Sequence, residues 1–157
     1  MASSLTLYNK FLQYIMDGTI DLDANTIKIA LVTSAYTPSP THDVLADVLA
    51  SPSPEVVAVA SPANGYTQGG ATIGGKVVDF TDSPIQGKFD ADNTEWTALT
   101  ATFRYGIVYA SGTLNGVVDP LIGYITFDTT PADIEVSGVD YVIQWSASGI
   151  FTLAPAA

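Results

Sequence analysis

Residues 21–48 read DLDANTIKIALVTSAYTPSPTHDVLADV, and this stretch decides the fold. Within it, residues 26–33 place Ile27, Ile29 and Leu31 on one side of the chain and residues 28, 30 and 32 on the other. A repeat of two residues combined with β-branched side chains is typical of a sheet strand. We therefore predict a mostly buried strand over residues 26–33.

A loop and a short helix are predicted to follow that strand. Pro38 and Pro40 interrupt residues 34–40, and proline cannot donate a hydrogen bond to a neighbouring strand. Thr41 can cap the start of a helix, whose apolar side would consist of Val44, Leu45 and Val48. The stretch is thus expected to form a strand, a wide loop and a short helix that covers part of the sheet.

The rest of the chain is predicted to be one N-terminal helix and many strands. Leu7, Phe11 and Tyr14 recur at helical spacing between Ser4, a candidate N-cap, and Gly18, which predicts a helix over residues 5–17. Strands are expected at residues 56–61, 76–82, 87–91, 94–97, 101–109, 121–128, 139–145 and 149–153. Ser137-Gly138 predicts a tight hairpin between residues 134–136 and 141–145. The expected fold is mainly β, a β-sandwich or jelly-roll-like domain with two helices, and an α+β layer is the alternative.

Length and composition indicate one domain over residues 1–157, with a flexible tail at residues 154–157. Hydrophobic residues make up 47% of the chain, which is enough for a packed core. Five basic residues stand against sixteen acidic ones, and the net charge is −11. Such a balance disfavours binding to nucleic acid or to an anionic membrane. The chain has no cysteine, so disulfides and thiolate metal sites are excluded.

Candidate catalytic and metal-binding groups are sparse, and we predict no enzyme activity, no cofactor and no metal. His42 is the only imidazole, and no nucleophile motif accompanies it. Asp21, Asp23 and Asn25 copy the start of a calcium loop, but its sixth and twelfth positions are not Gly and Glu, so a turn stabilised by side-chain oxygens is expected instead.

Two further groups have both a chemical and an ordinary interpretation. The carboxylates of Asp90, Asp92 and Glu95 could serve a glycosidase, although a solvated turn is the simpler expectation. Trp96 and Trp145 could stack on a sugar, but aromatic residues within apolar strands usually belong to the core. We therefore expect Trp145 and the nearby Phe151 to be core residues.

Five segments along the chain resemble a known family. They are residues 17–48, FDADNTEW at 89–96, RYGIVYASG at 104–112, PLIGYITFD at 120–128 and VIQWSASGIFTL at 142–153. Together, in this order and over nearly the whole chain, they resemble a family of small virion structural proteins of tailed bacteriophages. The match is loose at residues 51–63 and after Leu153. The resemblance implies a capsid or tail component.

Within that family, the expected function is that of a capsid decoration, or cement, protein. It would be made in the host cytoplasm and would bind the major capsid protein on the outer surface of the virion, as a homo-oligomer for which a trimer is the expectation. The alternatives are a head-fibre, tail or adaptor component, or a carbohydrate-binding module of a receptor-binding protein.

Proline-rich loops are predicted to supply the contact with the capsid, because proline restricts the chain before docking. Tyr36 is expected to be the anchor, and Tyr66 is expected to lie exposed between turns. The predicted contact residues are Tyr36, Pro38, Pro40, Pro52, Pro54 and Tyr66.

Overall fold

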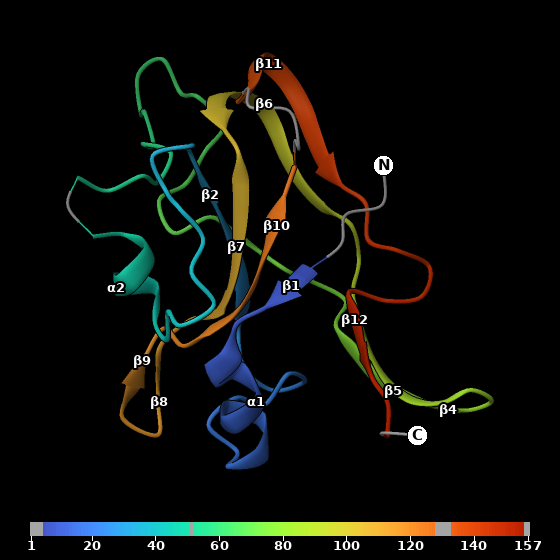
Figure 1. Cartoon of the computed structure of the whole chain (residues 1–157). Coiled ribbons are helices and arrows are strands. Elements are labelled where there is room, and N and C mark those ends of the chain that lie inside the picture. The colour runs from blue at the N-terminus through green and yellow to red at the C-terminus, as the bar shows by residue number, and fades with distance from the viewer. Residues whose placement is uncertain (1–4, 51, 128–132, 156–157) are drawn as a thin grey trace.

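Strands dominate the fold, as the computed structural model shows for residues 5–50, 52–127 and 133–155 (Figure 1). Strand accounts for 46% and helix for 8%, so the predicted mainly-β class is confirmed and the α+β alternative is not. The elements are β1 (Leu5–Leu7), α1 (Asn9–Met16), β2 (Ile27–Val32), α2 (Leu45–Val48), β3 (Ala71–Thr72), β4 (Val77–Asp82), β5 (Ile85–Asp90), β6 (Thr94–Phe103), β7 (Tyr105–Ala110), β8 (Thr113–Leu114), β9 (Val117–Val118), β10 (Leu121–Thr126), β11 (Ile134–Ile143) and β12 (Phe151–Leu153).

A five-stranded antiparallel sheet in the order β1-β10-β7-β2-β3 forms the centre of the molecule. The predicted strand at residues 26–33 is confirmed as β2, which pairs with β7 from Ile27 opposite Ala110 to Val32 opposite Tyr105. Both faces of β2 are buried: Ile27, Ile29 and Leu31 enter one core, and residues 30 and 32 enter another. The alternation in the sequence therefore separates two cores.

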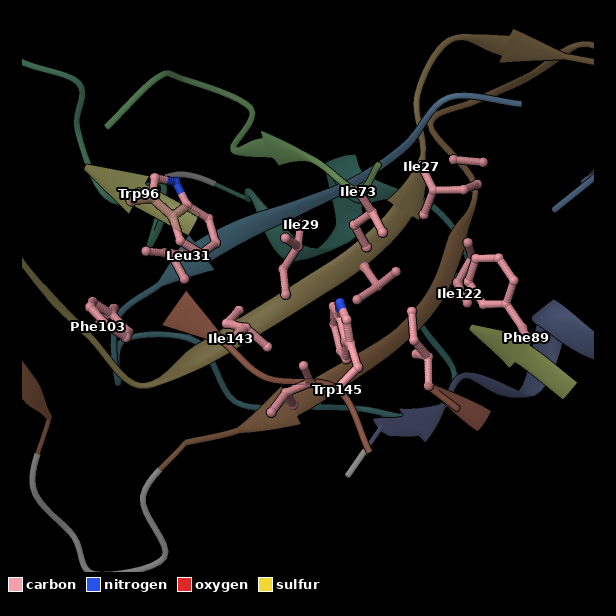
Figure 2. Close-up of a cluster of buried hydrophobic side chains, with 14 of the residues drawn as sticks. Ile27, Ile29, Leu31, Ile73, Phe89, Trp96, Phe103, Ile122, Ile143 and Trp145 are labelled. Carbon is pink, nitrogen blue, oxygen red and sulfur yellow. The ribbon is translucent and has the colours of Figure 1, made fainter. Parts of the chain in front are cut away.

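The larger core lies between the central sheet and a second layer, which gives the molecule a sandwich-like packing. The second layer contains the pair β11-β6 and the sheet β12-β5-β4. Figure 2 shows the side chains that fill this core, with Trp145 near the middle of the cluster. Phe11 of α1 also joins it and meets Phe151 edge-on, at 5.4 Å between ring centroids. The predicted core position of Trp145 is confirmed, and Phe151 is half-buried.

A layer without strands covers the opposite face of the central sheet. Residues 33–50, including α2, lie across it on the side away from β6 and β11 (Figure 1). This smaller core consists of Tyr8, Ala30, Val32, Tyr36, Leu45, Val48, Ile107, Tyr109 and Leu121. The predicted covering helix is therefore confirmed, although it spans only four residues.

The starts of both helices differ from the predictions. Residues 5–7 form β1 on the edge of the central sheet, and α1 begins at Asn9; Ser4 lies outside the described residues. The second helix begins at Leu45 rather than after Thr41. There the Asp47 carboxylate accepts hydrogen bonds from the main-chain nitrogens of Asp43 (2.9 Å) and Val44 (3.1 Å), so it satisfies free donors that Thr41 was expected to meet.

Several strand boundaries also differ. Ser137-Gly138 makes no hairpin: it lies inside β11, where the register shifts between Val136 and Val139. Residues 94–97 and the start of residues 101–109 join into the single strand β6. Residues 56–61 form no named strand, only an isolated bridge at Ala60. In the predicted tail, residues 154–155 are exposed and residues 156–157 lie outside the described residues.

Candidate functional site

Tyr36, the predicted anchor, is buried. Its side chain is 4% exposed, and its hydroxyl lies 2.8 Å from the Tyr8 hydroxyl and 3.0 Å from His42 Nδ1. The Tyr105 ring meets it edge-on at 5.8 Å. Burial raises the pKa of Tyr36, while the hydrogen bond with Tyr8 lowers it. In this conformation Tyr36 holds the covering layer on the sheet and offers no surface to a partner.

His42 belongs to the same cluster. It is partly exposed, as predicted, and it lies in the covering layer three residues before α2 rather than at the start of that helix. Its Nδ1 is hydrogen-bonded to a phenol and its ring lies 5.7 Å from the Tyr36 ring. His42 thus extends the buried hydrogen-bond chain of Tyr8 and Tyr36 toward the surface of the covering layer.

Tyr66 is buried as well, so the prediction that it is exposed is wrong. Its side chain is 5% exposed; its hydroxyl donates to Glu55 Oε1 at 2.8 Å and accepts from the Leu31 main-chain nitrogen at 3.1 Å. The same carboxylate oxygen accepts from the Gly69 nitrogen at 2.6 Å. Burial and the Glu55 charge raise the pKa of Tyr66.

The buried carboxylate of Glu55 was missed in the sequence. The only signal for it is a single acidic residue in the apolar run PEVVAVA at residues 54–60. Since a buried charge is costly unless it is hydrogen-bonded, such a residue in an apolar run indicates an internal polar contact. Glu55 therefore anchors the loop of residues 55–70 to β2 and is not a candidate for surface binding.

The predicted contact prolines separate into two groups. Pro54 is buried, and its carbonyl accepts a hydrogen bond from the Thr33 nitrogen at 2.9 Å. Pro38 is half-buried, whereas Pro40 and Pro52 are exposed. The Pro40 carbonyl accepts from the Asn9 nitrogen at 3.0 Å, which ties the exposed loop to the start of α1. Pro38, Pro40 and Pro52 thus remain available at the surface.

A groove of about 630 Å³ lies between α2 and the β8–β9 hairpin. The hairpin turns at Asn115 and Gly116, which have φ values of 48° and 83°, as an Asn-Gly turn of this type requires. Val118, at the end of the hairpin, is 58% exposed. The groove is lined by Val44, Leu45, Ala46, Leu49, Gly116, Val117, Val118 and Asp119. It is a mainly apolar surface that the sequence did not reveal, because its two walls lie some 70 residues apart.

Acidic side chains lie at and near this groove. Asp119 lines it, and one of its carboxylate oxygens accepts from the Gly112 nitrogen at 2.7 Å. Hydrogen bonds from the Asp43 and Val44 main-chain nitrogens lower the pKa of Asp47 in α2, despite some opposing desolvation. Asp47 is therefore ionised at neutral pH. Acidic side chains on both walls of the groove favour a partner with basic groups around an apolar contact.

The turn at residues 21–25 has the predicted structural role. One Asp21 carboxylate oxygen accepts from the nitrogens of Asp23 and Ala24, both at 3.0 Å. The ammonium group of Lys76 donates to the carbonyls of Asp23 (2.9 Å) and Asn25. The positive charge beside the Asp23 and Asn25 carbonyl oxygens is therefore the ammonium group of Lys76. Within the described ranges, no group of three or more His, Cys, Asp or Glu side chains could hold a metal ion.

The second acidic group is dispersed and solvated. Asp90 forms an ion pair with Lys88 at 3.1 Å, and its other oxygen accepts from the Ala91 nitrogen. Asp92 and Glu95 are exposed. Trp96 and Trp145 are 4% and 8% exposed, so neither presents a ring face to a sugar.

The described residues contain no helix that is both long and apolar enough to cross a membrane. No family model, no curated protein and no solved structure matches the chain.

Proposed function

We propose that the chain is a non-enzymatic structural protein of a tailed-bacteriophage virion, a decoration protein that binds the major capsid protein on the outer surface of the head. Support from the sequence comes from the resemblance of five segments, in order, to small phage virion proteins. The structural observation that carries the proposal is the apolar groove between α2 and the β8–β9 hairpin. It is the surface on which we place the capsid contact.

The groove has the features of a contact surface in an assembly. Its floor is apolar and Val118 is exposed at its edge, while Asp119 provides a charged rim. Pro52 lies three residues after Leu49, and Pro40 lies four residues before Val44, so two exposed prolines flank the groove in the sequence. An apolar centre with a polar rim is the usual anatomy of a protein interface.

Weak individual contacts are sufficient for this function. A protein that binds only the assembled shell stabilises that shell by mass action. Since a shell repeats the same site many times, copies that are linked to one another bind with an avidity above that of each contact. The predicted trimer is one way to link them.

The test uses heads that lack the protein. Purified chain is mixed with such heads, and bound protein is measured after separation on a density gradient. Val118→Asp places a charge in the apolar groove and should reduce binding at least tenfold. Val139→Asp is the matched control, because Val139 is 49% exposed but lies on β11. Binding of the control should equal that of the wild type.

Two outcomes would contradict the proposed function, and a third would contradict only the surface assigned to the contact. The chain could fail to bind heads and purify with tails, as expected for a tail or adaptor component. It could bind bacterial glycans, although both tryptophans are buried. Binding to heads that Val118→Asp leaves unchanged would overturn the assignment of the groove.

A further inference from the structure

Two Asn-Gly pairs occur in the chain, at residues 64–65 and 115–116, and the structure holds them differently. Asn115 and Gly116 form the two-residue turn of the β8–β9 hairpin. This hairpin extends away from the central sheet beside α2 (Figure 1), and both turn residues are exposed. The same dipeptide therefore stands in two environments within one molecule.

The side chain of Asn64 is held in place by three hydrogen bonds. Its Oδ1 accepts from the main-chain nitrogens of Val59 (3.0 Å) and Tyr66 (3.3 Å), and its Nδ2 donates to the Val57 carbonyl (2.9 Å). Gly65 lies so close to β6 that a Cβ at this position would be 2.4 Å from a main-chain oxygen of that strand. The amide of Asn64 cannot turn toward the Gly65 nitrogen without the loss of these contacts.

Asn115 has no such restraint. Within the part of the chain that the structure describes, neither its side chain nor the Gly116 nitrogen makes a hydrogen bond. Apart from its chain neighbours, no atom lies within 4 Å of a Cβ built on Gly116, so the turn is open to solvent. Asn115 also has a φ of 48°, in a region that residues with a side chain rarely adopt. The turn thus leaves the Asn115 amide free to move.

An asparagine that precedes a glycine loses its amide without an enzyme. The Gly116 nitrogen attacks Asn115 Cγ; the new N–Cγ bond closes a succinimide ring, and the Cγ–Nδ2 bond breaks. Ammonia leaves with the proton of the Gly116 nitrogen. Water then opens the ring at one of its two carbonyls and gives aspartate, or isoaspartate, in which the main chain runs through the former side chain. Glycine favours the attack because it has no side chain to hinder it and adopts many backbone conformations.

We propose that Asn115-Gly116 is a site of spontaneous deamidation and isomerisation, whereas the fold protects Asn64-Gly65 from the same reaction. The products are aspartate and isoaspartate at residue 115. The reaction consumes only water and releases ammonia, and no group is oxidised or reduced. This modification site does not depend on binding to capsids.

The isoaspartate product changes the groove beside α2. Gly116, Val117 and Val118 belong to the hairpin wall of that groove. Isoaspartate adds an atom to the main chain of a turn whose length sets the register of the hairpin. The pairing of Leu114 with Val117 is then displaced, and the wall moves with it. Aspartate at residue 115 adds a charge but leaves the length of the turn unchanged.

The first experiment compares the two sites within one molecule. The full-length chain is incubated in mildly alkaline buffer and digested, and mass spectrometry follows deamidation at residues 64 and 115; enzymatic methylation identifies isoaspartate. In the folded chain, residue 115 should convert at least tenfold faster than residue 64. In urea the two rates should become similar, because the fold no longer holds Asn64.

Three results would overturn the proposal. The first is equal rates at the two sites in the folded chain. The second is a folded chain in which residue 115 stays intact while the unfolded chain converts. The third is a tenfold difference that persists in urea, since the fold would then not be its cause. Asn115→Gly is the control: glycine accepts the positive φ and has no amide, so this variant should convert only at residue 64.

The second experiment tests the effect on the hairpin. In the purified isoaspartate form, amide exchange in residues 113–118 should become at least threefold faster than in the unmodified chain. Asn115→Asp carries the same charge on a turn of normal length and should exchange as the unmodified chain does. Unchanged exchange in the isoaspartate form, or equally fast exchange in Asn115→Asp, would overturn the displacement of the wall.

The third experiment rests on the proposed function. The isoaspartate form should bind heads at least threefold more weakly than fresh protein, and incubated Asn115→Gly should bind as it did before incubation. Fresh protein that binds no heads would contradict only the proposed function, because the modification is established by mass. Equal binding of the fresh and isoaspartate forms would overturn the link between the turn and the groove.

Discussion

Loop tyrosines are buried here because each hydroxyl finds a partner within the fold. Tyr36 meets Tyr8 and His42, and Tyr66 meets Glu55 and the main chain of Leu31. In the sequence, a tyrosine between turn residues is easily taken for an exposed contact residue. The groups that bind its hydroxyl lie up to 35 residues away and so are not visible in the local pattern. Burial of a phenol follows only when such a partner is present. These contacts were therefore not predictable from the local pattern.

Because its tyrosines are buried, the protein should lose stability at alkaline pH. The variant Tyr109→Phe measures how much of that loss comes from Tyr109. Burial, helped by the charges of Asp119 and Glu55, raises the pKa of Tyr109 from 10.0 to about 12. Above pH 10 the unfolded chain releases a proton that the folded chain retains, so the free energy of unfolding falls as pH rises toward 12. That loss is absent from Tyr109→Phe, and the stability difference between the two proteins should narrow over this range.

Urea unfolding at a series of pH values checks this prediction. Below pH 9 the variant should be less stable by a constant amount of about 1 kcal/mol, because it loses the hydrogen bond from the Tyr109 hydroxyl to the Gly69 carbonyl. Other buried tyrosines, such as Tyr8 and Tyr66, have raised pKa values and affect both proteins equally. A difference that stays constant up to pH 12 would show that Tyr109 titrates normally.

At the scale of elements, β2 was predictable and β1 was not. The period of two in residues 27–32 is a local property, and it holds because each face of the strand meets a core. Residues 5–7 continue the apolar stripe of α1, but they pair with β10. That pairing requires Gly123, since a Cβ at this position would lie 2.7 Å from Leu5 Cγ and from the Thr6 carbonyl oxygen. No local pattern connects Leu5 with a glycine so distant in the sequence.

The misassigned hairpin has a similar cause. Gly138 lies in a bulge of β11, where its nitrogen donates to Thr100 Oγ1 of β6 at 2.9 Å. β6 itself bends at Ala98, which has a φ of 50°. A glycine after a serine predicts a turn, but a neighbouring strand with a matching irregularity allows the chain to continue. The strand count was wrong here for that reason, while the fold class was right.

Asp79→Ala should open the edge of β4 to strand addition. The substitution frees the Phe80 nitrogen and removes a charge from an exposed apolar strand, and both changes favour pairing between chains. We expect turbidity and thioflavin fluorescence to increase during incubation near physiological temperature. Asp82→Ala is the control: it removes an equal charge but leaves the Phe80 nitrogen bonded. Equal aggregation of the two variants would show that charge alone protects the edge.

The whole molecule consists of three layers that share one sheet. Leu31 faces the sandwich core, and Leu121 faces the covering layer of residues 33–50; both are fully buried. The proposed capsid groove is formed partly by the covering layer, whereas the β4–β5 hairpin extends from the opposite layer. The position of the groove relative to the sandwich core therefore depends on how firmly the central sheet holds the layers together.

Leu31→Ala and Leu121→Ala test whether the layers unfold as one unit. Each removes the same side chain from one core and should cost about 2–5 kcal/mol, a decrease in Tm of about 4–20 °C for a chain of this length. Trp96 and Trp145 both lie in the sandwich core, so tryptophan fluorescence reports on that layer. If the sheet couples the layers, Leu121→Ala lowers the midpoint temperature measured by fluorescence as much as the midpoint temperature measured by circular dichroism. The contrary result would be a Leu121→Ala variant whose fluorescence transition stays at the wild-type temperature while amide exchange becomes faster in residues 36–49. The covering layer would then open independently of the sandwich core, and the groove would have no fixed wall before it binds a partner.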